Sequence, residues 1–245
     1  VFTTRGQPAL PQTEVVSPLR LLEIAPAAAG AVFAAGLVNS GLLAFLPIWA
    51  ETLSAAVTAQ PAAIVVGAVY VGSMLTQWPA GHISDRFDRR IVIAVLAALA
   101  AAAALALAVI ATPSLLAGSI LAGLWGAASL AYYAVAVAHA VDRSKAEELP
   151  AIASGLLMVW AAGSVAGPIL AGLAYSGPLG ARGLFLFAAA ASLALTAAML
   201  VRRRQNAPVA EGERESFLYL SATSGALAEA PPAEADEAGA GRGAP

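Results

Sequence analysis

The residues best suited to electrostatic chemistry lie together in the segment Gly81-His82-Ile83-Ser84-Asp85-Arg86-Phe87-Asp88-Arg89-Arg90. Its three arginines and two aspartates can form ion pairs with one another or with acidic groups of another loop. Arg86 or Arg90 could reach Asp142, Glu147 or Glu148 in this way. The segment separates two apolar runs, each long enough to cross a bilayer as a helix. Because basic residues in short loops set membrane orientation, we expect it in water on the cytoplasmic side.

Four further side chains within or beside apolar runs are candidates for contact with a solute or an ion. An amide near the middle of a membrane is costly unless it bonds a neighbour or faces water, so Asn39 either links helices or lines a cavity. Trp125 and Tyr132 either pack between helices or offer a ligand a stacking and hydrogen-bonding surface. His139 is a candidate for protonation near pH 7, with an ordinary boundary histidine as the alternative.

The composition excludes several classes of protein. With 60% hydrophobic and 11% charged residues, against about 25% charged residues in soluble domains, the chain is expected to be an integral membrane protein. A net charge of -2 gives no reason to expect nucleic-acid binding, and the absence of cysteine excludes disulfides and thiolate metal sites. There is no Gly-x-Ser-Gly motif and no aspartate pair within an apolar run, so we expect neither an enzyme nor a bound metal or cofactor.

The apolar runs predict an all-α, polytopic membrane protein with six transmembrane helices. A span needs about 20 apolar residues, and only helices satisfy their backbone groups in lipid without a partner strand. The chain then divides into a polar linker at 1–24, a six-helix transmembrane region at 25–203 and an acidic, disordered tail at 204–245. The expected spans are about 25–49, 61–82, 91–111, 114–139, 150–175 and 183–201.

The distribution of Lys and Arg predicts how the chain lies in the membrane. Of its 13 basic residues, all but Arg182 fall before the first span, after the last, or in the loops after the second and fourth. The positive-inside rule then places both termini in the cytoplasm of a multi-pass protein of the cell membrane.

The third and sixth spans carry almost no polar side chains, and both could face lipid all round. Their recurrence at this interval predicts two three-helix repeats. Such repeats are a hallmark of secondary transporters, which bind substrate near the bilayer midplane.

Two motifs carry a family resemblance over roughly residues 19–203. Gly81, Asp85, Arg86, Arg89 and Arg90 resemble the Gly-x-x-x-Asp-Arg-x-Gly-Arg-Arg loop of the major facilitator superfamily, in its expected place after a second helix, with Asp88 where glycine is usual. Asp tolerates a left-handed backbone, so the turn could survive this change. In the fifth span a second set is similar to the motif Gly-x-x-x-Gly-Pro-x-x-Gly-Gly, with its last glycine pair reduced: Gly163, Gly167, Pro168 and Gly172.

The resemblance implies a function. In this family the loop aspartate docks at a helix N-terminus of the opposite half and latches the cytoplasmic side shut, and the first and fourth helices line the substrate path. The chain is then expected to move a small solute by alternating access, with a proton as the candidate coupling ion. A loop that merely sets orientation is the alternative role for these charges.

The resemblance also implies partners. The polar opening and the segments 18–47 and 136–143 resemble a C-terminal six-helix half in the YcaD-like, sugar-porter-type branch. Its partners would be the lipid bilayer, the solute and either an N-terminal half or a second copy of the chain. A noncatalytic scaffold that acts through its tail is the other alternative; deletion of 206–245 would abolish scaffolding but spare transport.

Overall fold

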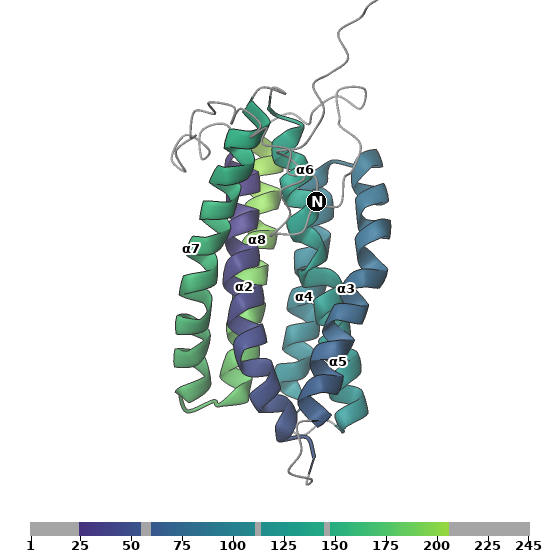
Figure 1. Ribbon diagram of the computed structural model, residues 1–245, viewed down its shortest axis with the longest axis vertical. Coiled ribbons are helices and arrows are strands. Elements are labelled where there is room, and N and C mark those ends of the chain that lie inside the picture. Colours follow the sequence, from purple (N-terminus) through teal and green to yellow (C-terminus); the bar gives the residue numbers. More distant parts are fainter. Residues whose placement is uncertain (1–24, 55–59, 111–113, 145–147, 206–245) are drawn as a thin grey trace, which may run out of the picture.

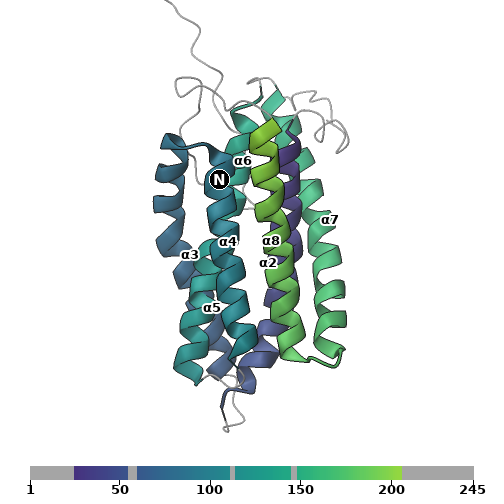
Figure 2. The ribbon, with the colours of Figure 1, turned by 180° about the vertical axis from the view of Figure 1, so that it is seen from behind.

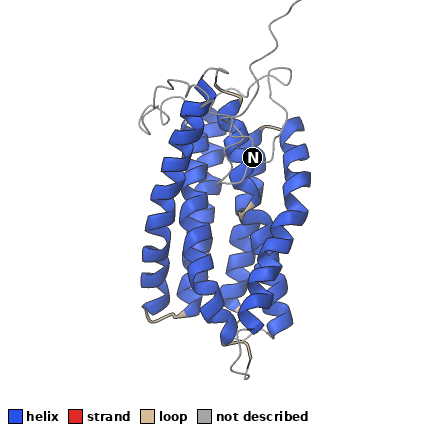
Figure 3. Ribbon diagram, viewed as in Figure 1, coloured by secondary structure: helices blue, strands red, loops and turns tan. Residues whose placement is uncertain are grey.

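The structure is a computed structural model that describes residues 25–54, 60–110, 114–144 and 148–205. All regular structure in these ranges is helical (Figures 1 and 3). The expected linker at 1–24, almost all of the expected tail and Glu147 lie outside the described residues. The helices are α2 (Pro26–Glu51), α3 (Gln60–Arg86), α4 (Arg89–Val109), α5 (Leu115–Ser129), α6 (Ala131–Val141), α7 (Leu149–Ser176) and α8 (Ala181–Gln205).

Six helical spans in the described residues are long and apolar enough to cross a membrane. The fourth span, Leu115–Val141, is made of α5 and α6, which meet at Leu130. Leu130 keeps helical dihedral angles (φ -78°, ψ -25°), so the chain direction continues through the junction. The expected all-α, six-span class is therefore confirmed.

The charged segment differs from the expected loop. Helix α3 continues to Arg86 and α4 begins at Arg89, so only Phe87 and Asp88 separate the two helices. Asp85 thus lies on the last turn of α3, and Arg89 and Arg90 lie on the first turn of α4. The second span was expected to end at 82, before the end of α3. Charged side chains at a helix end can leave the membrane although the helix itself continues.

The packing of the six spans supports two three-helix repeats. The most extensive contacts join α2 with α7, α3 with α5, and α4 with α8. In span numbers these are pairs 1 with 5, 2 with 4, and 3 with 6. If span 1 is exchanged with span 4, span 2 with span 5 and span 3 with span 6, the pair 1–5 becomes the pair 4–2 and the pair 3–6 stays the same. The contacts therefore have the symmetry expected of two three-helix repeats. Figures 1 and 2 show α7 beside α2 towards one edge of the bundle and α3 with α5 towards the other, and Figure 2 shows α8 between α7 and α4.

The expectation that the third and sixth spans could face lipid all round is wrong. Helix α4 buries Ile93, Ala97, Ala100 and Ala104 completely. Thr196 of α8 donates a hydrogen bond to the backbone oxygen of Ala94, at 3.3 Å, and one within its own helix. Alanine lets two backbones approach without a polar side chain between them, so the lack of polar residues indicates close helix packing here rather than exposure to lipid.

Glycines line the contact between α2 and α7. A Cβ atom added to Gly163 would clash with the backbone oxygen of Phe33, and one added to Gly167 would clash with that of Leu37. On the opposite helix, a Cβ at Gly41 would lie 2.9 Å from the backbone oxygen of Gly167. A Cβ at Gly172 would first meet the ring of Phe45 and not a backbone atom, and α7 continues through Pro168. The backbones of α2 and α7 therefore meet directly at the first two glycines of the second motif.

The symmetry-related contact between α3 and α5 is built in the same way. Gly72 faces the backbone of Gly123, and Gly126 faces the backbone of Val69, each too closely for a Cβ atom. Both of these symmetry-related helix pairs are thus held together by direct contact between backbones.

Candidate functional site

The ion pairs of the charged segment centre on Arg89, whose side chain is 1% exposed. Its Nε donates to Asp142 Oδ2 at 2.7 Å and its Nη2 donates to Asp142 Oδ1 at 3.1 Å. The same Nη2 lies 3.4 Å from Oδ1 of Asp85, one turn earlier in the chain. Two-pronged arginine–carboxylate pairs are both strong and directional. Arg89 therefore joins the ends of α3 and α4 to the residue that follows α6.

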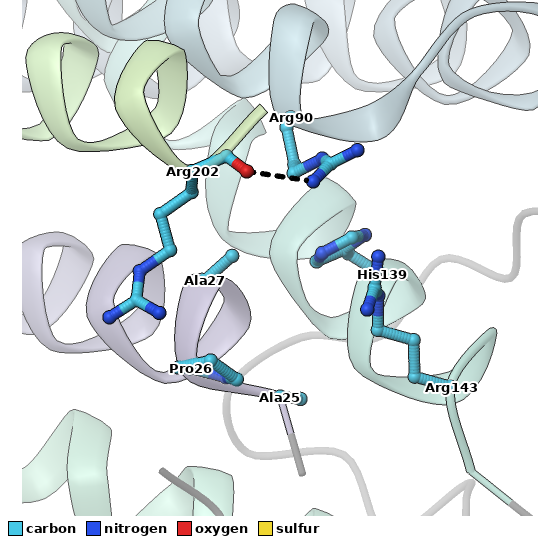
Figure 4. Close-up of a pocket in the computed structure, with 7 residues that line it drawn as sticks. All are labelled: Ala25, Pro26, Ala27, Arg90, His139, Arg143 and Arg202. Atoms are coloured by element: carbon cyan, nitrogen blue, oxygen red, sulfur yellow. Dashed lines mark hydrogen bonds between the residues drawn. The ribbon is translucent and has the colours of Figure 1, made fainter. Parts of the chain in front are cut away.

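Arg90 joins α4 to the end of α8. Its Nη1 donates to the backbone oxygen of Arg202 at 3.1 Å, on the last turn of α8 (Figure 4). Backbone oxygens at a helix C-terminus carry partial negative charge, so a guanidinium is favoured there. The remaining nitrogens of Arg90 pair with Asp88, at 3.1 Å from Nε and 3.0 Å from Nη2. Together with the Arg89 contacts, this cluster fastens four helices at one end of the bundle.

Asp88 has a different role from the glycine that the resemblance implies. Its φ of -57° is ordinary, and none of the described non-glycine residues has a positive φ. Asp88 is instead the N-cap of α4, and its Oδ1 accepts a hydrogen bond from the Arg90 N–H at 3.0 Å. Burial opposes its ionisation, but the hydrogen bonds and charge of Arg90 outweigh burial and hold the pKa of Asp88 below its usual value.

Two features of the charged segment were not expected. Asp142 pairs with Arg89, and the contacts that Arg86 or Arg90 could make with Asp142, Glu147 or Glu148 stay a prediction. Arg86 is exposed at the end of α3. The segment is also less solvated than expected, since Arg89 and Arg90 are each 2% exposed and Gly81 is buried. What the structure does bring together, as expected, are the basic residues that follow the second, fourth and sixth spans.

Asn39 forms a hydrogen-bonded link between helices. Its side-chain oxygen accepts a hydrogen bond from the Ser129 hydroxyl at 2.5 Å, and its Nδ2 donates to the Ser129 backbone oxygen at 3.4 Å. Asn39 is half-buried and Ser129 is completely buried. These two bonds connect α2 to the end of α5 and favour the interpretation of Asn39 as a link between helices.

Trp125 and Tyr132 have no exposed surface in this conformation. The Tyr132 hydroxyl lies beside Ser129 without a hydrogen bond of good geometry, and Trp125 Nε1 has no hydrogen-bond partner in the described part of the chain. Both residues lie on the span that carries Ser129, the hydrogen-bond partner of Asn39. Asn39, Trp125 and Tyr132 are therefore grouped around the junction of α5 and α6. Their role in a substrate cavity stays a prediction.

Replacing Asn39 with Leu should lower the free energy of unfolding by about 1 kcal/mol, the scale of hydrogen bonds between membrane helices. Ser129→Ala should cost a similar amount, and the double variant should cost less than the sum because the two residues share their bonds. Thermal unfolding of the purified protein measures all three. A normal melting temperature for Asn39→Leu with a changed substrate affinity would instead favour a cavity.

His139 lies on the last turn of α6 and is 4% exposed. It faces a small pocket together with Arg90, Arg143 and Arg202 (Figure 4). The sequence placed His139 near a membrane boundary but gave no sign of these arginine neighbours, because Arg90 and Arg202 come from helices far away in the chain. Its role in proton coupling stays a prediction.

Sequence reasoning also gave no specific role to Ser129 or Arg202. Most membrane serines and threonines bond their own preceding turn, as Thr76 and Ser119 do here. Nothing in the sequence distinguishes Ser129 from these. Arg202 contributes a backbone oxygen to Arg90, and backbone contacts leave no trace in residue type.

Within the described residues, six membrane-length helical spans, paired as two repeats and joined at one end by arginines and aspartates, define a polytopic, all-helical membrane protein. Residues 28–237 match the pattern of the Major Facilitator Superfamily, and the chain belongs to that family.

Several relatives come from the genus Yersinia and are named as uncharacterized MFS-type transporters. One from Yersinia pseudotuberculosis is 30% identical over 146 residues, which are 56% of this chain and 34% of that protein. Another, from Yersinia enterocolitica, is 29% identical over 180 residues, which are 69% of this chain and 42% of that protein. The chain thus spans about a third to two fifths of the relatives it matches. No solved structure matches it.

Proposed function

We propose that this chain is the C-terminal six-helix half of a secondary transporter that moves a small solute by alternating access. Family membership supports transport, and the repeat packing supports a rigid half that rocks against a partner. The observation that carries the proposal is the ion-pair cluster around Arg89, because it fastens four helix ends into one body. A body fastened in this way can tilt as a unit, which a rocking mechanism requires.

The cluster also supports a role in gating. The Asp85 side chain is 31% exposed, although it pairs with the buried Arg89. Its carboxylate can therefore face a second half while Arg89 holds it in place. A helix N-terminus of that half would attract the carboxylate by about 0.3–1 kcal/mol when exposed and about 2 kcal/mol when partly buried. Energies of this size bias an equilibrium between two conformations that differ by a few kcal/mol.

Asp85→Asn should slow transport about two- to thirtyfold, because it removes the attraction between the Asp85 carboxylate and a helix N-terminus. The amount of protein in the membrane should stay normal. The measurement is uptake by proteoliposomes of a solute first identified by an uptake screen. Glu51→Gln is the matched control, since Glu51 is an exposed carboxylate on the last residue of α2, at the opposite end of the bundle. An Asp85→Asn rate equal to that of the control would exclude the gating role.

Three finer assignments complete the proposal. The absence of a charged side chain from the middle of the described spans favours a neutral or amphipathic solute on this half. A proton is the proposed coupling ion, with His139 as its candidate carrier. The grouping of basic residues at one end of the bundle supports cytoplasmic termini in a cell membrane and, with the resemblance to the YcaD-like, sugar-porter-type branch, a C-terminal half.

A further inference from the structure

A small pocket lies at the same end of the bundle as the ion pairs, where the first turn of α2 meets α4, the end of α6 and α8 (Figure 4). Its volume is about 20 Å³, enough for one water-sized atom or group. Figure 4 shows the side chains of His139 and Arg143 near Arg90, while Arg202 turns its backbone oxygen towards Arg90 and its side chain away. The lining residues are Ala25, Pro26, Ala27, Arg90, His139, Arg143 and Arg202.

The pocket carries more positive than negative charge. Of the residues that the structure describes, three arginines and no carboxylate line it, and of these arginines Arg90 is paired with Asp88. Asp142, next to Arg143 in the chain, is paired with Arg89. Arg143 has a buried Nε without a hydrogen-bond partner in the described part of the chain. A buried guanidinium nitrogen that lacks an acceptor is costly, so the arrangement favours an anion beside it.

His139 adds a buried imidazole to the pocket. Its side chain lines the pocket and is 4% exposed. An imidazole N–H that faces the pocket would supply one more donor to an anion.

The first turn of α2 adds backbone donors from Ala27 onward, because Pro26 at its start has no N–H. Ala25 is the N-cap residue of α2 and provides no side-chain acceptor, although Ala27 and Ala28 behind it are buried. The first N–H groups of a helix have no partner within the helix and carry partial positive charge. Such a terminus binds phosphate and carboxylate groups readily.

We propose that this pocket binds a phosphate group, one oxygen of which enters the cavity between the α2 N-terminus, His139 and Arg143. The donors come from the start of α2 and from the end of α6, and together they suit the several oxygens of a phosphate better than the two of a carboxylate. Arginine forks also match phosphate geometry. The phosphate belongs either to an anionic phospholipid headgroup, which basic pockets between membrane helices bind, or to free phosphate.

The test uses the purified native polypeptide that contains this chain and follows its thermal unfolding by tryptophan fluorescence. In one arm the Tm is measured at increasing concentrations of inorganic phosphate and compared with the Tm in sodium chloride of equal ionic strength. In the other, vesicles of mixed phosphatidylglycerol and phosphatidylcholine are compared with phosphatidylcholine alone. We expect a saturable rise in Tm of about 2–10 °C in at least one arm, the response expected for a ligand present well above its Kd. The arm that responds identifies the source of the phosphate.

Three variants assign the effect to the pocket. Arg143→Gln should weaken the apparent affinity at least about tenfold, the cost of losing a charged hydrogen bond. Ala25→Asp supplies a carboxylate at the α2 N-cap and should remove the response without loss of folding. Arg203→Gln, a change at an exposed neighbour of Arg202, should respond like the unmodified protein. The absence of a response in both arms, an equal response to sodium chloride, or a full response from Ala25→Asp would overturn the proposal.

Discussion

Replacing Asp142 with Asn is expected to lower the free energy of unfolding by about 3–5 kcal/mol, because it removes the closest partner of a buried arginine. The side chains of Arg89 and Asp142 are only 1% and 2% exposed. Water therefore cannot replace the lost charge, and Asp85 is farther from Arg89, at 3.4 Å. For a chain of this size the expected fall in Tm is about 6–20 °C, measured by thermal unfolding of the purified protein.

Two further variants control for this effect. Arg203→Gln changes the net charge by one unit in the opposite direction at an exposed position of the same end, and its Tm should stay within about 2 °C of the original. Replacing Arg89 and Asp142 together with Leu should recover much of the lost stability, since an apolar pair of similar volume often substitutes for a buried ion pair. A Tm for Asp142→Asn as high as that of Arg203→Gln would refute the role of this pair in fastening the helix ends.

Replacing Gly167 with Ala should destabilise the bundle by about 1–3 kcal/mol or more, as overpacking of a rigid contact does. The added Cβ would meet the backbone oxygen of Leu37 and lie 3.0 Å from the nitrogen of Gly41. Backbone atoms cannot rotate away, so the two helices must separate. We expect a lower Tm and less folded protein on size-exclusion chromatography of solubilised membranes.

Gly30→Ala is the matched control on the partner helix α2. A Cβ at Gly30 has nothing within 4 Å, so alanine there should be neutral or should raise stability by up to about 1 kcal/mol through its helix propensity. The two glycine-to-alanine changes should therefore act in opposite directions. Equal effects on Tm would show that propensity, and not the contact between α2 and α7, decides the outcome.

The sequence predicted the number and type of elements well, because lipid imposes one length and one structure on each span. The third expected span, 91–111, corresponds to a helix at Arg89–Val109. The second was expected to end at 82 but continues to Arg86. Apolar length measures the membrane-embedded part of a helix, not the polar turn that projects beyond it.

Partner choice within the site could not be read from the sequence. Arg86, Arg89 and Arg90 are chemically alike, and which one meets Asp142 depends on the helical phase at which α4 begins. Because Asp88 caps α4, Arg89 becomes its first residue and its side chain is directed to the end of α6. The glycines of α7 likewise predicted a close contact, but only the packing shows that α2 is the helix they meet.

The mass of the native polypeptide that contains this sequence tests the central claim most directly. The measurement is a blot of host membranes with an antibody against residues 206–245. A transporter built from two six-helix halves predicts a band at about twice the 24.4 kDa of this chain. A band at 24.4 kDa would contradict the two-half account, and would require the gate to form between identical six-helix subunits.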